Sequence, residues 1–182
     1  MRTGEFTGFS VTLRNPGIAW IQFNTPERLN GLTHRIKRDL VETINQAQMD
    51  NAVRVMVFTG SGRAFCAGDD ISGQKKPISG EPLIRNCDKI AIAAVNGIAI
   101  QTGMTLALAC DFRVAAASAK LGSATLRFGL LPDEGGQYLC VQLMGVAKSM
   151  DFFINKRILS ADQALELGLL HEVVDDHELE SR

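Results

Sequence analysis

Apolar runs alternate with amphipathic segments along this chain. The runs at 53–59 (VRVMVFT) and 90–95 (IAIAAV) are largely aliphatic, a pattern typical of strands buried on both faces of a sheet. Residues 9–24 alternate around Asn15-Pro16-Gly17, which predicts a β-hairpin. The remaining pattern predicts two strands, over 112–115 and 170–174. It also predicts four helices: one over 103–109, two that begin near Gly135 and Ala147, and one capped by Ser160 and Gln163. Strands that alternate with helices indicate an α/β fold with a largely parallel sheet.

The segment 33–49 predicts an amphipathic helix. Thr33 can cap its N-terminus, and the apolar residues recur at the spacing of one helical face: Ile36, Leu40, Ile44 and Ala47. The charged residues lie largely outside this apolar stripe, and we interpret them as a face exposed to solvent: Arg35, Lys37, Arg38 and Glu42.

Composition narrows the class of protein. The 182 residues are 46% hydrophobic and 21% charged, which is ordinary for a globular protein. The 19 Lys and Arg residues nearly balance 20 Asp and Glu residues, so the charge predicts no nucleic-acid partner and no anionic membrane surface. We expect a single domain over 1–182, with one flexible polar segment at 73–82 (GQKKPISGEP).

Cysteine and histidine positions argue against a disulfide scaffold and a metal site. The four cysteines are Cys66, Cys87, Cys110 and Cys140. No pair has C-x-x-C spacing, so we expect four buried free thiols in a reducing compartment, the cytoplasm. The histidines, at His34, His171 and His177, match no metal or catalytic-triad pattern and are expected at the surface or at helix ends.

Neither a leader nor a membrane span is expected. Residues 1–8 are polar and lack the apolar centre of a signal peptide. The most apolar stretch, 90–110, is interrupted by glycines and by polar residues.

Two glycine-containing turns are the candidates for chemistry. Residues 63–70 (RAFCAGDD) and 95–103 (VNGIAIQTG) each follow an apolar run, where a strand gives way to a helix. Free backbone N–H groups at such positions can bind a negative oxygen, and two facing turns would form an oxyanion hole with two donors. The alternative is that these glycines only permit tight turns. Neither a phosphate-binding G-K-[ST] sequence nor a complete G-x-G-x-x-G fingerprint is present.

Six motifs stand in order along the chain: 26–32 (PERLNGL), 62–70 (GRAFCAGDD), 93–97 (AAVNG), 109–113 (ACDFR), 129–132 (GLLP) followed by Gly135-Gly136, and 158–169 (ILSADQALELGL). From about Phe9 to Glu178 the chain thereby resembles the enoyl-CoA hydratase/isomerase family, also called the crotonase family. The resemblance implies an α/β, crotonase-like spiral of ββα units that binds acyl-CoA thioesters and needs no cofactor beyond the coenzyme A of its substrate.

The resemblance also assigns binding residues. The family's oxyanion hole uses two backbone N–H groups, which here belong to Asp69 and Thr102. The positions that match its coenzyme A contacts are Arg28, Ala64, Ala67 and Gly68. Arg28 would meet a phosphate of coenzyme A; the alternative is an ordinary surface arginine.

The acid–base positions depart from the family's hydratases. The two glutamates that those enzymes use fall on Thr105 and Thr125, and threonine cannot serve as a general base near neutral pH. Isomerase branches place a carboxylate directly after the proline of the fifth motif, which here is Asp133, with Glu134 beside it. The resemblance therefore favours isomerisation of an enoyl-CoA double bond through Asp133. The alternative is that Asp133 and Glu134 only cap a helix.

Three functions stay open at this point: an isomerase, a hydratase or other crotonase chemistry, and a non-catalytic protein that binds acyl-CoA. The family's C-terminal helices are expected to be absent or truncated, and the stretch between Asp70 and Ile90 is shorter than usual. A homotrimer or hexamer is the expected assembly.

Overall fold

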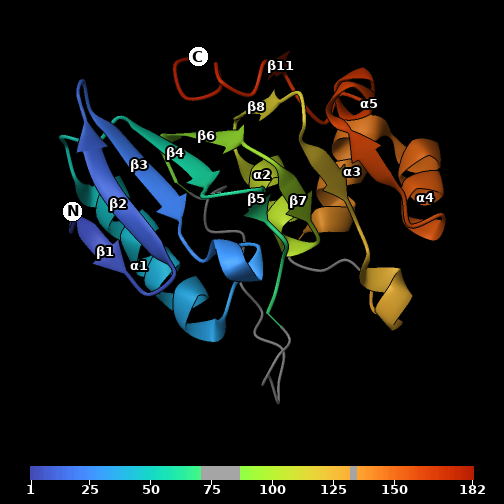
Figure 1. Ribbon diagram of the computed structural model, residues 1–182, viewed down its shortest axis with the longest axis horizontal. Helices are drawn as coiled ribbons and strands as arrows, with labels where there is room; N and C mark the ends of the chain where they lie inside the picture. Colours follow the sequence, from blue (N-terminus) through green and yellow to red (C-terminus); the bar gives the residue numbers. More distant parts are fainter. Residues whose placement is uncertain (71–86, 132–134) are drawn as a thin grey trace.

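The computed structural model describes residues 1–70, 87–131 and 135–182, and its largest feature is a sheet of seven strands (Figure 1). The strands lie in the order β1 (Gly4–Phe6), β2 (Phe9–Arg14), β3 (Ile18–Phe23), β4 (Val55–Gly60), β6 (Ile90–Val95), β8 (Phe112–Ala116) and β11 (Glu172–Val174). The first three pair antiparallel, and every later pairing in this sheet is parallel. The predicted hairpin and the largely parallel sheet are thus confirmed, whereas β1 was not predicted.

A second, four-stranded sheet was missed at the sequence level. It contains, in spatial order, β10 (Ile158–Ser160), β9 (Lys120–Gly122), β7 (Ile98–Ile100) and β5 (Ala64–Cys66). The interpretation of 63–70 and 95–103 as turns was therefore incomplete, because each contains one of these strands. Three residues are too few to display an alternating pattern.

The helices agree closely with the sequence pattern. They are α1 (His34–Met49), α2 (Thr102–Ala109), α3 (Gly136–Met144), α4 (Val146–Ile154) and α5 (Ala161–Glu166), with short 3-10 turns η1 (Pro26–Arg28) and η3 (Thr125–Phe128). The Thr33 hydroxyl accepts a hydrogen bond from the backbone N–H of Ile36 at 3.3 Å, and Ser160 and Gln163 form a capping box. The two predicted helix starts are confirmed by these caps.

A repeated unit produces the spiral. In β4–β5, β6–β7 and β8–β9 the first strand joins the large sheet and the second joins the small sheet. Equivalent strands of successive units pair in parallel: β4 with β6 and β6 with β8 in the large sheet, and β5 with β7 and β7 with β9 in the small sheet. In the middle unit the chain then enters α2 directly. This is the ββα spiral that the family resemblance implied.

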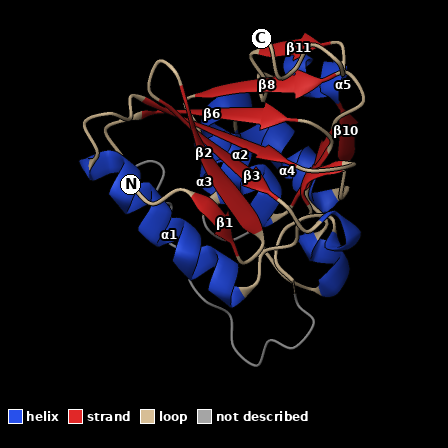
Figure 2. Cartoon of the chain, turned by 60° about the vertical axis from the view of Figure 1, so that its left-hand side comes forward, coloured by secondary structure: helices blue, strands red, loops and turns tan. Residues whose placement is uncertain are grey.

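Both faces of the large sheet are apolar. In β4, Met56 and Phe58 face the main core, whereas Val57 belongs to a smaller cluster on the opposite face with Leu179 from the C-terminal segment. Helix α1 lies alongside the N-terminal strands, and the C-terminus ends beside β11 (Figure 2). The continuous apolar run at 53–59 is explained by burial on both sides.

The structure bears on two further expectations and leaves a third untested. All four cysteines are free, but Cys87 is only half buried, so burial was predicted correctly for Cys66, Cys110 and Cys140 alone. The polar segment 73–82 lies outside the described residues. No helix in the described part of the chain is long and apolar enough to cross a membrane.

Candidate functional site

The two glycine turns lie side by side at the carboxyl ends of β5 and β7. The strands pair in parallel, so the chain leaves both at the same edge of the small sheet. A Cβ on Gly68 would lie 2.8 Å from Cβ of Gln101, and a Cβ on Gly103 would lie 1.9 Å from the carbonyl oxygen of Cys66. Only glycine permits this approach, which brings the residue after Gly68 close to the start of α2.

Each turn contributes one backbone N–H group to the candidate site, from Asp69 and from Thr102. Leu32 bridges the first turn: its N–H donates to the Gly68 carbonyl at 2.8 Å, and its carbonyl accepts from the Asp70 N–H at 3.0 Å. Asp69 lies between these two bonds. Thr102 is the first residue of α2, where no intrahelical acceptor exists. Within the described residues, neither the Asp69 N–H nor the Thr102 N–H donates a hydrogen bond.

The residue before Thr102 has an unusual backbone. Gln101 has φ 55° and ψ −125°, a conformation that glycine adopts far more readily. The residue is held there because its N–H donates to the Gly122 carbonyl at 3.0 Å and its own carbonyl accepts from the Thr105 N–H at 3.0 Å. This conformation turns the chain sharply from β7 into α2.

Two asparagines secure the entry to the first turn. The side-chain amides of Asn30 and Asn96 both donate to the carbonyl oxygen of Ala64, at 2.7 and 3.2 Å. Asn30 is 1% exposed, and its Oδ1 accepts from the Thr25 N–H at 2.9 Å. Both asparagines come from motifs that the sequence analysis singled out, and together they hold the connection from β4 to β5.

The two threonines at the family's glutamate positions are buried. Thr105 lies in the first turn of α2, and Thr125 begins η3. The Thr125 hydroxyl lies 3.1 Å from that of Ser123. Asp133 and Glu134, the predicted proton-transfer residues, lie outside the described residues.

The positions expected to contact coenzyme A surround the first turn. Arg28 is half exposed and forms an ion pair with Asp70. The Ala67 N–H donates to the Leu29 carbonyl at 3.0 Å, Ala64 is buried, and Gly68 is buried against Gln101. The structure thus brings Arg28, Ala64, Ala67 and Gly68 to the same strand end, although they are as much as 40 positions apart in the chain.

Lys37 does not lie on a solvent-exposed face, and that interpretation was wrong. Its side chain is 11% exposed, and its Nζ lies 2.8 Å from both carboxylate oxygens of Asp69. Arg35 and Arg38, by contrast, are 67% and 75% exposed. Lys37 precedes Leu40 by three residues and Ile44 by seven, so it flanks the apolar stripe of α1. This spacing is the feature of the sequence that could have predicted the burial of Lys37.

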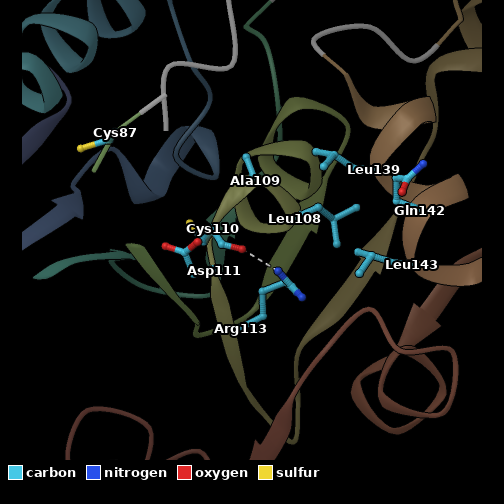
Figure 3. A pocket seen from close by; sticks show the side chains of 9 residues that line it. All are labelled: Cys87, Leu108, Ala109, Cys110, Asp111, Arg113, Leu139, Gln142 and Leu143. Carbon is cyan, nitrogen blue, oxygen red and sulfur yellow. Dashed lines mark hydrogen bonds between the residues drawn. The ribbon is translucent and has the colours of Figure 1, made fainter. Parts of the chain in front are cut away.

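A separate cavity of about 200 Å³ lies beside the C-terminal end of α2 (Figure 3). Its lining comprises Cys87, Leu108, Ala109, Cys110, Asp111, Arg113, Leu139, Gln142 and Leu143. Arg113 is 5% exposed, and its Nη1 and Nε donate to the carbonyls of Cys110 and Leu169 at 2.6 and 2.8 Å. Because Cys110 caps α2, this guanidinium holds the end of the helix opposite Thr102.

Burial shifts the pKa values of Cys110, Cys140 and His171. The pKa of the Cys110 thiol is raised by burial, and burial likewise raises the pKa of Cys140 to about 12. The pKa of His171 is lowered, first by burial and then by the charge of Arg113. His171 Nδ1 accepts a hydrogen bond from the Arg113 backbone N–H at 3.2 Å. In the described parts of the chain, no three His, Cys, Asp or Glu side chains gather as metal ligands would.

The chain is similar to a known protein family and to individual members of it. Residues 14–182 match the family model described as enoyl-CoA hydratase/isomerase. The chain is 37% identical over 179 residues to 1,2-epoxyphenylacetyl-CoA isomerase of Escherichia coli K12, covering 90% of this chain and 68% of that protein. It therefore spans about two thirds of that relative's length.

Two solved structures extend the comparison. Enoyl-CoA hydratase subunit I from Geobacillus kaustophilus HTA426 superimposes with a TM-score of 0.91 at 29% identity, over 98% of this chain and 73% of that one. A Thermobifida fusca YX chain solved in complex with acetoacetyl-CoA has a TM-score of 0.85 at 31% identity, over 96% of this chain and 76% of that one. Since the family model matches nearly the whole sequence and the folds superimpose, the chain belongs to the enoyl-CoA hydratase/isomerase family.

Proposed function

We propose that this chain binds an acyl-CoA thioester and isomerises the double bond of an enoyl-CoA. The observation that carries the proposal is the pair of N–H groups on Asp69 and Thr102, which lie on two touching turns and donate no hydrogen bond within the described parts of the chain. The thioester oxygen accepts both hydrogen bonds. When a proton leaves C2, negative charge develops on that oxygen, and donors fixed in advance lower the barrier. The start of α2 contributes the positive end of a helix dipole.

The proton is carried by Asp133 in this proposal. Its carboxylate removes a proton from C2 of a 3-enoyl thioester, and the electrons of that C–H bond enter a dienolate. The same carboxyl group returns the proton to C4, and the double bond forms between C2 and C3. The threonines at 105 and 125 support this choice, because they leave the usual hydratase positions without a base. The similarity to a protein named 1,2-epoxyphenylacetyl-CoA isomerase supports isomerisation of a CoA thioester in general, because that name gives an epoxide substrate.

Coenzyme A contacts Arg28, Ala64, Ala67 and Gly68 in this arrangement. Arg28 is half exposed and can offer donors to a phosphate while Asp70 holds its guanidinium in place. No cofactor besides the coenzyme A of the substrate is required by this chemistry.

The proposed assembly is a homotrimer or hexamer. Helix α4 exposes Val146, Met150 and Ile154, which recur every fourth residue and form one apolar stripe. Burial of such a stripe favours association. Sedimentation or light scattering at micromolar concentration tests this, and a stable monomer would contradict it.

The mechanism is tested by Asp133→Asn. The variant should lower conversion of 3-enoyl-CoA to 2-enoyl-CoA by roughly 10²–10⁴-fold, the usual contribution of one positioned base. Affinity for acetoacetyl-CoA should change little, because binding depends on backbone donors and coenzyme A contacts. Glu134→Gln is the matched control and should lose less activity. A silent Asp133→Asn would rule out this base.

Hydration is the second candidate, favoured by one observation. The buried hydroxyls of Ser123 and Thr125 lie 3.1 Å apart and could together hold a water. Efficient hydration of 2-enoyl-CoA by the unmodified protein, with Asp133→Asn silent, would support this alternative. Under the isomerase proposal, the unmodified protein hydrates 2-enoyl-CoA slowly. Thr105→Glu combined with Thr125→Glu should then raise that hydration rate. Binding of acyl-CoA without turnover of either substrate would instead indicate a non-catalytic protein.

A further inference from the structure

An ion pair joins helix α1 to the turn that carries one proposed oxyanion donor. Lys37 Nζ lies 2.8 Å from both carboxylate oxygens of Asp69, and the two side chains are 11% and 24% exposed. The partners are 32 residues apart in sequence, so tertiary structure brings them together. Asp69 is also one of the two site residues whose backbone N–H donates no hydrogen bond among the described residues.

The identity of residue 69 creates an electrostatic conflict. Its N–H must stabilise a developing negative charge, yet its side chain carries a negative charge on the same residue. Like charges at such short range oppose each other, and low exposure weakens screening by solvent. A carboxylate there would raise the free energy of the enolate unless a cation compensated it.

We propose that Lys37 is a positioning residue for the oxyanion hole: its ammonium group neutralises the Asp69 carboxylate and holds it away from the thioester oxygen. This inference rests on the proposed function of the Asp69 N–H. Lys37 acts through Asp69 and does not itself contact substrate. Arg28 and Asp70 form a second ion pair at the next residue, so both carboxylates of this turn are paired with cations from outside it.

Acetoacetyl-CoA provides a probe of enolate stability that needs no turnover. Its enolate absorbs in the near ultraviolet, so the pH midpoint of enolate formation can be measured on the bound ligand. Lys37→Met should raise this midpoint by about one pH unit or more, a tenfold weaker stabilisation of the enolate, equal to about 1.4 kcal/mol. Lys37→Arg should restore most of the effect. Arg38→Met, on the exposed face of the same helix, is the matched control and should leave the midpoint unchanged.

The double variant separates charge compensation from a structural role. In an Asp69→Asn background no carboxylate remains to neutralise. Lys37→Met should therefore shift the pH midpoint by less than about 0.5 unit, a factor of three in the equilibrium constant of enolate formation. An equal shift in both backgrounds would overturn the inference, as would an unshifted midpoint in a folded Lys37→Met variant. If the unmodified protein binds acetoacetyl-CoA without forming its enolate, the proposed function fails, and this inference fails with it. An enolate that forms normally without Lys37 refutes only the role of Lys37.

Discussion

The α-carbon of Gly103 packs so closely on Cys66 that a Cβ at position 103 would lie 1.9 Å from the Cys66 carbonyl oxygen. This contact joins the first turn of α2 to the last residue of β5. The spacing between the two turns, and hence between the N–H groups of Asp69 and Thr102, depends on the absence of a side chain at Gly103.

Gly103→Ala should therefore destabilise the protein although alanine favours helices. Inside a helix this change normally stabilises by about 1 kcal/mol. Here the contact with Cys66 forces α2 away from β5, and we expect a loss of about 2–3 kcal/mol in the free energy of unfolding together with weaker acetoacetyl-CoA binding. Gly129→Ala serves as a comparison with backbone strain but no clash: its φ is 70°, which costs alanine about 1–2 kcal/mol, and no atom lies within 4 Å of the added Cβ. Denaturant unfolding measures both variants, and a loss below about 1 kcal/mol in Gly103→Ala would show that the contact with Cys66 does not act as expected.

Gln101→Gly should stabilise the chain. Gln101 occupies φ 55° and ψ −125° at the N-cap of α2, and relief of that backbone strain should exceed the added flexibility of glycine in the unfolded chain. We expect a gain of about 1 kcal/mol, measured by thermal unfolding. Gln101→Ala keeps the unfavourable φ and should show no gain. If alanine stabilised as much as glycine, the Gln101 side chain would be the source of the strain.

Arg113→Met should destabilise the chain by roughly 3 kcal/mol, measured by denaturant unfolding. The change leaves the carbonyls of Cys110 and Leu169 without the guanidinium donors that they now share. Buried acceptors without partners each cost about 1–3 kcal/mol. Arg54→Met, at an exposed position before β4, should cost little. Similar losses in the two variants would argue against a special role for Arg113.

Acid should weaken the fold partly through His171. Because the pKa of this imidazole is lower in the folded chain than its ordinary 6.5, the unfolded chain binds more protons between the two values. The free energy of unfolding should therefore fall as pH drops from 6.5 through the folded pKa. His171→Asn keeps an acceptor for the Arg113 N–H but cannot titrate, and its stability should decline less over the same window. An NMR titration of the His171 ring should give a midpoint below 6.5, and a midpoint above it would contradict the prediction.

Much of the fold follows from local sequence patterns. The helices α1 and α5 are bounded by caps at Thr33 and Ser160, and the strand at 90–95 is a single uninterrupted apolar run. Such signals involve residues close together in the chain, so they can be recognised without knowing what packs against them. The six ordered motifs indicated the family for the same reason, and the comparisons confirm it.

Other features depend on contacts between distant segments. The small sheet consists of three-residue strands that are defined by their partners, not by their own pattern. In the sequence, Lys37 resembles the exposed charged residues of α1. Its ion pair with Asp69 is evident only once the packing of α1 is known. The backbone of Gln101 is unfavourable locally and is held by hydrogen bonds to Gly122 and Thr105. The sequence by itself determined the long elements and the family, because these depend on local periodicity and motif order. The tertiary structure alone decided how the two turns meet and which charges face each other, because those interactions join residues that are far apart in the chain.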